Sequence, residues 1–492
     1  MTTQKTLLRG RILDFVAEPQ SPEDDSAHIH IEDGAILIEG GRIVARGGFA
    51  EVNRQAGDAE IIDHRPHLLM AGFIDPHIHF PQVQVIASWG AQLLDWLNNY
   101  TFPAETEYAD PAHSAAMAGR FYDQILAHGT TTAVAYCSVH KTSAQAYFAE
   151  AVRRNMCMIG GKVMMDRNAP DGLRDTPQSS YDDSKALIAE WHGRGRAQYA
   201  ITPRFAITST PEQMEMAGAL VAEHPDCFVQ THLSENHDEI AFTAALYPEA
   251  RDYLDVYQSH GLLSEKMLLG HSIHLKPREI DVLVETGARP VFCPTSNLFL
   301  GSGLFDDAGL RARGTINAIA TDVGGGTSYS MLQTLNEGYK ILQLQRQRLH
   351  PLRAFHWITR GNAVALGMED RIGTLAPGSD ADIVVLTRAP PRRWRCGWSA
   401  PRRWPKSFSC CRSWAMTAPL RRSMSRAHRH EKGAAGRFRP RSTGLIGWAS
   451  CQRRRSSIPS SPQSCCWLDG SSTSWFIRAM MSSTDKASSW AS

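Results

Sequence analysis

The sequence predicts an α/β protein in which a (β/α)8 TIM-type barrel is joined to a small β-sandwich domain. Eight apolar runs typical of buried parallel strands recur between residues 68 and 323, and helical patterns lie between several of them. Short strands separated by turn residues precede these runs, and one further apolar run follows near residue 386. Eight strands with intervening helices over about 250 residues is what a (β/α)8 barrel requires.

The small β-domain is predicted from both ends of this pattern. In residues 1–67, residues 7–13 are one strand candidate, and the runs 35–38 and 42–45 flank Glu39-Gly40-Gly41 as a hairpin would. Residues 371–388 contain the apolar run 382–386 and return to the same domain. The small domain therefore uses two segments that lie far apart in the sequence.

The barrel is expected to occupy residues 68–370. Its strand candidates are residues 68–75, 129–137, 156–165, 199–207, 227–235, 267–275, 289–297 and 317–323. Helical patterns are clearest at residues 110–127, 184–191 and 277–286, and they continue through 331–342 and 351–366.

The composition changes abruptly near residue 391. The chain has 492 residues and a formal charge of +2, but residues 391–492 hold 17 Arg and 3 Lys against three acidic residues. That region therefore carries +17, and residues 1–390 carry −15. Six of the ten cysteines and eight of the twelve tryptophans also lie there, so it does not resemble the rest of the chain.

Several explanations of residues 389–492 compete. A nucleic-acid-binding tail would explain the arginines but not the tryptophans and the two Cys-Cys pairs. A disulfide or zinc module would need regular cysteine spacing, and none is visible. We interpret the tail as frame-shifted and disordered, because a GC-rich gene read out of register near residues 387–391 yields many Arg, Pro, Ser, Trp and Cys codons. Without closing strands after residue 386, we expect unpaired sheet edges and poor solubility or stability.

The rest of the chain predicts a cytoplasmic protein. Cys137, Cys157, Cys227 and Cys293 form no CxxC pair, and we expect buried free thiols in a reducing compartment. The near-neutral overall charge argues for no nucleic-acid partner. No apolar stretch fits a signal peptide, and no run of eighteen apolar residues exists, so no membrane association is expected.

The strongest functional signal is Asp75-Pro76-His77-Ile78-His79, at the end of the first barrel strand. Two histidines spaced i, i+2 on a strand point to the same side. At that end both face the mouth, where such barrels hold their sites. The pair is half of a transition-metal site, although alone it is equally compatible with two ordinary surface histidines.

Three later strand ends supply partners for these histidines. His232 ends the fifth strand candidate, His271 the sixth and Asp322 the eighth, and Glu235 follows His232 by three positions. Each directly follows an apolar run, at the same end of its strand. Separate strands of one barrel therefore deliver four histidines and one aspartate to one place, which predicts a shared metal site.

With these residues the chain resembles the amidohydrolase superfamily over roughly residues 7–386, and more closely its guanine deaminase family. The histidine pair and the final aspartate mark only the superfamily. The segments 100–105 and 202–205 are more specific. The closer resemblance rests on His77 to His79 with Gln82, and on residues 96–105, 202–205 (Thr-Pro-Arg-Phe), 232–236, 293–298 and 324–331.

The resemblance implies a hydrolase of purine catabolism in which His77, His79, His232 and Asp322 bind one Zn²⁺ per chain. Fe²⁺ suits the same ligands. Bound Zn²⁺ lowers the pKa of water to about 7, so that hydroxide attacks the aminated carbon of guanine and gives xanthine and ammonia. His271 would aim the hydroxide, Glu235 would carry its proton to the ring nitrogen, and Asp322 would protonate the departing amine.

Substrate contacts are expected from Gln82, Arg204 and Phe205, together with His232 and Glu235. Arg204 would donate to the purine carbonyl, Phe205 would stack on the ring, and Gln82 offers a donor and an acceptor to the Watson–Crick edge. Packing competes as an explanation of Phe205, and a carboxylate at a helix N-terminus competes as an explanation of Glu235.

Two other functions stay open. One is an amidohydrolase acting on a different heterocycle, such as cytosine, 8-oxoguanine or a triazine. The other is a non-catalytic scaffold with the same barrel, although such relatives have usually lost metal ligands. A homodimer is implied by the resemblance alone.

Overall fold

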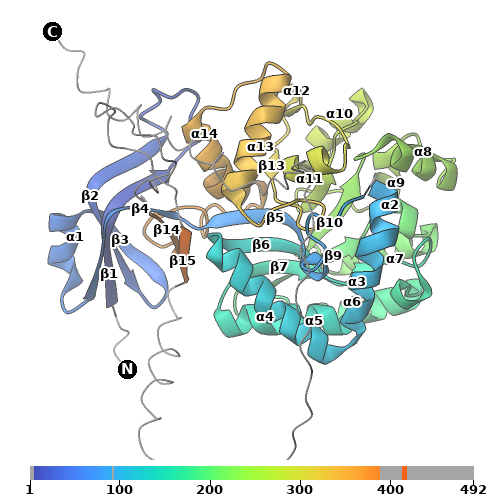
Figure 1. The fold of residues 1–492 in the computed structure, drawn as a ribbon, viewed down its shortest axis with the longest axis horizontal. Coiled ribbons are helices and arrows are strands. Elements are labelled where there is room, and N and C mark those ends of the chain that lie inside the picture. The colour runs from blue at the N-terminus through green and yellow to red at the C-terminus, as the bar shows by residue number, and fades with distance from the viewer. Residues whose placement is uncertain (1–4, 91–92, 388–412, 418–492) are drawn as a thin grey trace, which may run out of the picture. The chain divides into compact units, whose positions relative to one another are not determined.

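The computed structural model describes residues 5–90, 93–387 and 413–417. In these residues it contains a curled six-stranded sheet and a parallel barrel with helices around it (Figure 1). The expectations for residues 389–492 lie outside the described residues, apart from the short segment 413–417.

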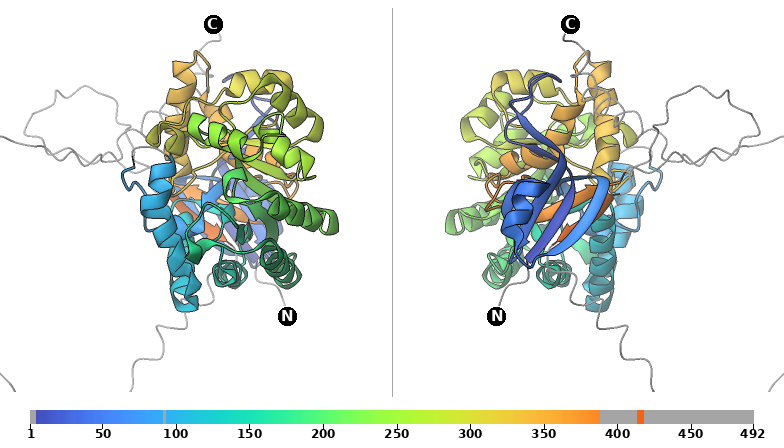
Figure 2. Two further views of the ribbon diagram at one scale, coloured as in Figure 1. Left: turned by 90° about the vertical axis from the view of Figure 1, so that its right-hand side faces the viewer. Right: turned by 90° about the vertical axis from the view of Figure 1, so that its left-hand side faces the viewer.

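The smaller sheet has the strand order β15-β14-β4-β1-β2-β3, so the predicted β-sandwich takes the form of one curled sheet (Figure 2). Gly40 and Gly41, both at positive φ, make the predicted hairpin between β2 and β3. The helix α1 (Phe49–Ala56) packs on one face through Val52 and Ala56. The strands are β1 (Lys5–Phe15), β2 (His28–Glu39), β3 (Arg42–Gly48), β4 (Glu60–Ala71), β14 (Asp382–Leu386) and β15 (Ser413–Thr417).

The β14 edge of this sheet differs from expectation. The strand β15 pairs antiparallel with β14, from Asp382 opposite Thr417 to Leu386 opposite Ser413. The expectation that nothing after residue 386 closes the sheet was therefore wrong at this edge. Strand pairing uses backbone groups that every residue except proline carries in full, so a segment with no hydrophobic period can still pair.

Eight parallel strands in the order β13-β12-β11-β10-β9-β7-β6-β5 form the barrel. Backbone bonds from Asp322 N to His77 O (3.0 Å) and from His79 N to Val323 O (2.6 Å) join its first strand to the segment after its last. The strands are β5 (Phe73–His79), β6 (Thr130–Tyr136), β7 (Cys157–Gly161), β9 (Gln198–Pro203), β10 (Phe228–Leu233), β11 (Met267–His271), β12 (Arg289–Phe292) and β13 (Ala318–Ile319), with the short β8 (Val163–Met164) beside β9.

Helices cover the outside of the barrel (Figures 1 and 2). The predicted helix at residues 110–127 begins after an Asp110 cap, and the predicted helix 277–286 has those bounds. The helices are α2 (Leu93–Trp96), α3 (Phe102–Thr106), α4 (Pro111–Ala127), α5 (Lys141–Arg154), α6 (Pro177–Trp191), α7 (Pro211–Glu223), α8 (His237–Leu246), α9 (Tyr253–Ser259), α10 (Pro277–Thr286), α11 (Pro294–Phe299), α12 (Asp307–Arg313), α13 (Met331–Leu344), α14 (Pro351–His356) and α15 (Asn362–Ala365).

The first barrel strand begins later than the predicted 68–75. Residues 68–71 belong to β4 and pair with β14, whereas β5 starts at Phe73. Between them, the Gly72 N–H donates to Asp382 O (2.8 Å), and a Cβ on Gly72 would lie 2.1 Å from Thr131 Oγ1. One continuous apolar run therefore passes from one sheet to the other, and the crossing point needs a glycine.

One buried cluster includes a side chain from each of the eight strands, among them Ile74, Phe228 and Ala318. The four cysteines of the described part are buried and free, as predicted. Within that part no helix combines the length and the apolar character needed to cross a bilayer.

Candidate active site

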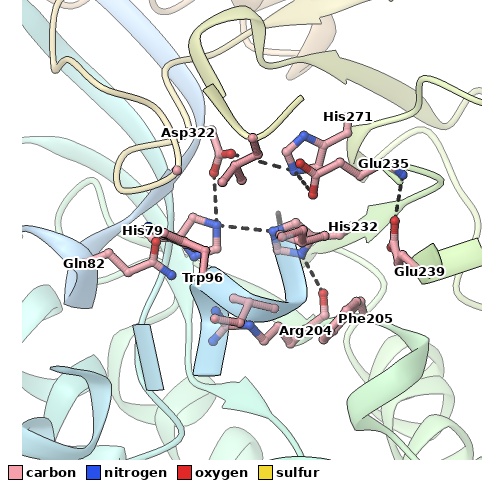
Figure 3. A pocket seen from close by; sticks show the side chains of 14 residues that line it. His79, Gln82, Trp96, Arg204, Phe205, His232, Glu235, Glu239, His271 and Asp322 are labelled. Atoms are coloured by element: carbon pink, nitrogen blue, oxygen red, sulfur yellow. Dashed lines mark hydrogen bonds and ion pairs between the residues drawn. The ribbon is translucent and has the colours of Figure 1, made fainter. Parts of the chain in front are cut away.

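Five predicted side chains meet at the carboxyl ends of the barrel strands. His77 and His79 lie on β5, His232 on β10, and His271 is the last residue of β11. Asp322 follows β13 by three residues. Figure 3 shows His79, His232, His271 and Asp322 turned toward one space.

The ligand-type atoms of His77, His79, His232 and Asp322 all lie within 4.8 Å of one another. Asp322 Oδ1 is 3.3 Å from His77 Nε2 and 3.2 Å from His79 Nε2. His79 Nε2 is 3.2 Å from His232 Nε2. His271 lies beside them, with Nε2 3.8 Å from Asp322 Oδ2, and its ligand-type atom is within 4.8 Å of those of His77, Cys293 and Asp322. The first four groups are thus close enough to share one cation.

Burial sets the charge of these groups. It lowers the pKa of His79, of His232 and of His271, the last to about 3, so the three imidazoles are neutral at pH 7. Burial opposes ionisation of Asp322, but its contacts with the imidazoles of His77 and His79 outweigh this and hold its pKa well below the usual value. Neutral imidazoles and an ionised carboxylate are the forms that bind metals.

The donor set fits a transition metal. Neither ring nitrogen of the buried His77 makes a well-formed hydrogen bond among the described residues, and Nε2 has only its 3.3 Å contact with Asp322 Oδ1, a costly arrangement unless another group binds there. His232 Nδ1 lies 2.7 Å from Arg204 O, which leaves Nε2 to face the cluster. Histidine nitrogens and carboxylate oxygens are ligands that Zn²⁺ takes in proteins.

The residues on either side of Asp322 hold it in place. The buried Asp75 carboxylate accepts hydrogen bonds from the backbone nitrogen of Thr321 (3.1 Å) and from its hydroxyl. After Asp322 the chain turns so tightly that a Cβ on Gly326 would lie 1.8 Å from Thr321 O. The glycine run 324–326 therefore allows a tight turn close beside Asp322.

Glu235 points into the same space from the loop after β10 (Figure 3). Its Oε1 accepts a hydrogen bond from Ser302 Oγ (2.7 Å), and its Oε2 is 3.3 Å from His271 Nε2. Burial, and then repulsion from Glu239 and Asp322, raises the pKa of Glu235 well above its usual value. Asn236 is the N-cap of α8, and Glu239 completes its capping box by accepting from the Asn236 backbone N–H. The helix N-terminus is therefore capped without Glu235, which answers the competing explanation of Glu235 as a helix-terminal carboxylate.

A pocket opens onto this cluster, and the predicted recognition residues Gln82, Arg204 and Phe205 line it. Gln82 follows β5 and Arg204 and Phe205 follow β9, and all three are buried. Trp96 lines the pocket as well, whereas Trp89 is 74% exposed. The pocket is lined by His79, Gln82, Leu93, Trp96, Leu97, Arg204, Phe205, His232, Glu235, Glu239, His271, Leu300, Asp322 and Gly325.

Several contacting residues were not predicted. Ser302 holds Glu235, and Asn297 Nδ2 lies 2.8 Å from His271 Nδ1. Glu105 pairs with Arg204 and with Gln82. Asn297 and Glu105 fall inside segments 293–298 and 96–105, which carry the family resemblance, so these two residues could have been found from the sequence. Ser302 lies in no such segment.

Fold and site together define the class, a (β/α)8-barrel hydrolase with a candidate metal centre at the barrel mouth. Residues 68–400 match the Amidohydrolase family. A guanine deaminase of Escherichia coli (strain K12) is 47% identical over 390 residues, 78% of this chain and 89% of that protein. The chain therefore belongs to the amidohydrolase family, in the branch that contains this guanine deaminase.

Solved structures agree with this placement. The E. coli guanine deaminase structure is 46% identical, has a TM-score of 0.77, and matches over 81% of this chain and 93% of its own. The guanine deaminase of C. acetobutylicum, with guanine bound in its active site, is 26% identical with a TM-score of 0.71, over 78% of this chain and 91% of its own.

Proposed function

We propose that this protein hydrolyses guanine to xanthine and ammonia. The observation that carries the proposal is the position of the Glu235 carboxyl group, beside His271 and at the edge of a four-donor cluster, in a pocket walled by Arg204 and Phe205. Relatives that cover most of the chain are named guanine deaminases, which supports the same reaction.

Recognition of guanine falls to the residues on the Arg204 side of the pocket. Arg204 donates N–H groups to the purine carbonyl, because a guanidinium has only donors. Phe205 supplies an apolar ring face for stacking, and Gln82 pairs with the Watson–Crick edge. His232 and Glu235 reach the reacting end of the purine, since both face the cluster and the pocket.

His77, His79, His232 and Asp322 would hold one Zn²⁺, with Fe²⁺ as the alternative. When bound, the metal acts as a Lewis acid and lowers the pKa of water toward neutrality. Glu235 takes a proton from the attacking water and delivers it to the ring nitrogen next to the attacked carbon, a task that suits its raised pKa. His271 orients the water. Asp322 takes the second proton of that water from the hydroxyl group now on the attacked carbon and passes it to the amine, so that ammonia leaves as the carbon–nitrogen bond breaks and the carbonyl of xanthine forms.

We also propose that the protein is a cytoplasmic homodimer without nucleic-acid or membrane partners. The cytoplasmic compartment is supported by the free cysteines of the main body, and the homodimer is what the resemblance implies. The acidic charge of residues 1–390 argues against nucleic-acid and membrane partners. Sedimentation of the purified protein would measure its oligomeric state directly.

The experiment is xanthine formation from guanine by the purified wild type, by Glu235→Gln and by Glu223→Gln, with bound metal quantified in each. Glu235→Gln keeps the shape but cannot carry the proton, so kcat should fall about a thousandfold with metal content unchanged. Glu223 is exposed on α7, and its variant should match wild type.

Two results would count against the proposal. Ammonia release from cytosine, 8-oxoguanine or an aminotriazine but not from guanine would assign a different heterocycle. Purification without stoichiometric metal, together with no turnover of any of these substrates, would favour the non-catalytic scaffold.

A further inference from the structure

Glu105 is a buried carboxylate behind the pocket that the proposed reaction leaves unused. It lies on α3, is 1% exposed, and is not one of the described residues that line the pocket. The reacting cluster is formed by other side chains, so Glu105 has no direct part in the chemistry. A buried carboxylate needs partners, because an unpaired charge inside a protein is strongly destabilising.

Its two partners are the two polar recognition residues. Glu105 Oε2 accepts from Arg204 Nη1 at 2.6 Å, and Oε1 accepts from Gln82 Nε2 at 2.9 Å. Arg204 is 2% exposed and Gln82 is 1% exposed, so solvent does not compete for these bonds. One carboxylate thus fixes two side chains that come from different barrel strands.

The second bond decides which way the Gln82 amide points. Gln82 Oε1 accepts from the backbone N–H of Gly324 at 3.1 Å, while Nε2 donates to Glu105. A flipped amide would place oxygen against the Glu105 carboxylate and NH₂ against the Gly324 N–H, which is unfavourable at both ends. Glu105 and Gly324 together allow one orientation only.

The first bond decides where the Arg204 donors point. A guanidinium has five N–H donors in one rigid plane. Nη1 is committed to Glu105, and the guanidinium carbon lies 5.5 Å from the centre of the Phe102 ring, so the group is held from two sides and its remaining donors have set directions. A ligand in the pocket therefore meets a fixed donor from Arg204 and a fixed amide from Gln82.

We propose that Glu105 is a positioning residue that sets the specificity of the pocket for a purine with a carbonyl, and against one with an amino group, at the edge that Arg204 contacts. The inference rests on the proposed function. An amino group at that edge would bring N–H against the N–H of Arg204, and the locked Gln82 amide cannot turn its oxygen to accept it. Sites built on fixed hydrogen bonds reject such analogues strongly.

The test compares wild type with Glu105→Gln, Glu105→Asp and the control Glu107→Gln, on guanine and on 2,6-diaminopurine. Glu107 lies two residues further on and is exposed, so its variant should match wild type. In Glu105→Gln, KM for guanine should rise about 10- to 100-fold, the loss of one or two charge-assisted hydrogen bonds, while kcat changes little. The preference for guanine over 2,6-diaminopurine should fall about tenfold or more.

Glu105→Asp keeps the charge beside Arg204 but is one methylene too short to reach both partners. It should fold and bind metal normally and show a smaller change in the same direction. An unchanged preference in both variants, or a fall in kcat at constant KM, would overturn the proposal.

Binding of xanthine, measured by calorimetry, separates this inference from the reaction. If wild type forms no xanthine from guanine, the proposed function fails. Weaker xanthine binding in the Glu105 variants than in wild type would still support the positioning role, and equal binding would refute it.

Discussion

The imidazole of His232 is oriented by Arg204, since His232 Nδ1 lies 2.7 Å from the Arg204 carbonyl oxygen. The backbone of the recognition arginine thereby aims a candidate metal ligand, while its side chain lines the pocket. Specificity and chemistry are coupled through one residue after β9. Changes to this segment should consequently affect metal binding and guanine binding together.

Gly326→Ala should disrupt the loop that carries Asp322. Its Cβ would lie 1.8 Å from Thr321 O, so the backbone must move, at a cost of about 1–3 kcal/mol. We expect a lower melting temperature and substoichiometric metal, measured by differential scanning fluorimetry and elemental analysis. Gly119→Ala is the matched control, because nothing lies within 4 Å of its Cβ on α4. Equal metal content in both variants would contradict this role of Gly326.

Ser302→Ala should weaken catalysis through Glu235. The Ser302 hydroxyl donates to Glu235 Oε1 at 2.7 Å, and loss of a hydrogen bond to a charged group costs about 1.5–3 kcal/mol. The loop itself should stay in place, because the Ser302 carbonyl keeps its 2.8 Å contact with His274 Nε2. We expect kcat/KM to fall about 10- to 100-fold in steady-state assays. Ser302→Thr retains the hydroxyl and should recover most of the activity.

His356 should make the protein less stable in acid. Burial lowers the pKa of His356 to about 4, so the native state binds fewer protons than the unfolded state between about pH 4 and pH 6.5. The free energy of unfolding is unaffected by His356 above pH 6.5, and it decreases as the pH falls toward 4 because the unfolded state then binds the extra proton. The free energy of unfolding should be measured with denaturant at pH 8 and at pH 5. Its decrease between the two pH values should be about 2 kcal/mol larger in wild type than in His356→Gln. Parallel losses in the two proteins would exclude this role.

Restoring the reading frame near residues 387–391 should raise stability and yield. In the structure β14 already has β15 as a neighbour, so the gain should come from apolar closing strands rather than from pairing alone. We expect the melting temperature to rise by several degrees in a thermal melt. An intact open frame through this point on resequencing, or equal melts, would defeat the frame-shift interpretation.

Local sequence pattern was enough to predict which side chains meet at the mouth of the barrel. His77, His79, His232, His271 and Asp322 each lie at the end of an apolar run, and parallel strands of one barrel bring such ends together. The boundary between β4 and β5 was missed because the apolar run continues through Gly72 while the strands change sheets.

Residues that act across the fold were beyond local pattern. Glu105 meets Gln82, 23 positions earlier, and Arg204, 99 positions later, and it lies on a short helix rather than at a strand end. Ser302 reaches Glu235 from 67 positions away. Such pairings depend on how loops pack, which no periodicity in one sequence specifies.

The most direct measurement is anomalous diffraction at the zinc edge from crystals of the zinc-loaded protein. We predict one strong peak per chain, about 2.0–2.2 Å from a nitrogen of each of His77, His79 and His232 and from an oxygen of Asp322. The proposed metal centre would be contradicted if the zinc-loaded protein showed its anomalous peak elsewhere, or no peak between these four side chains.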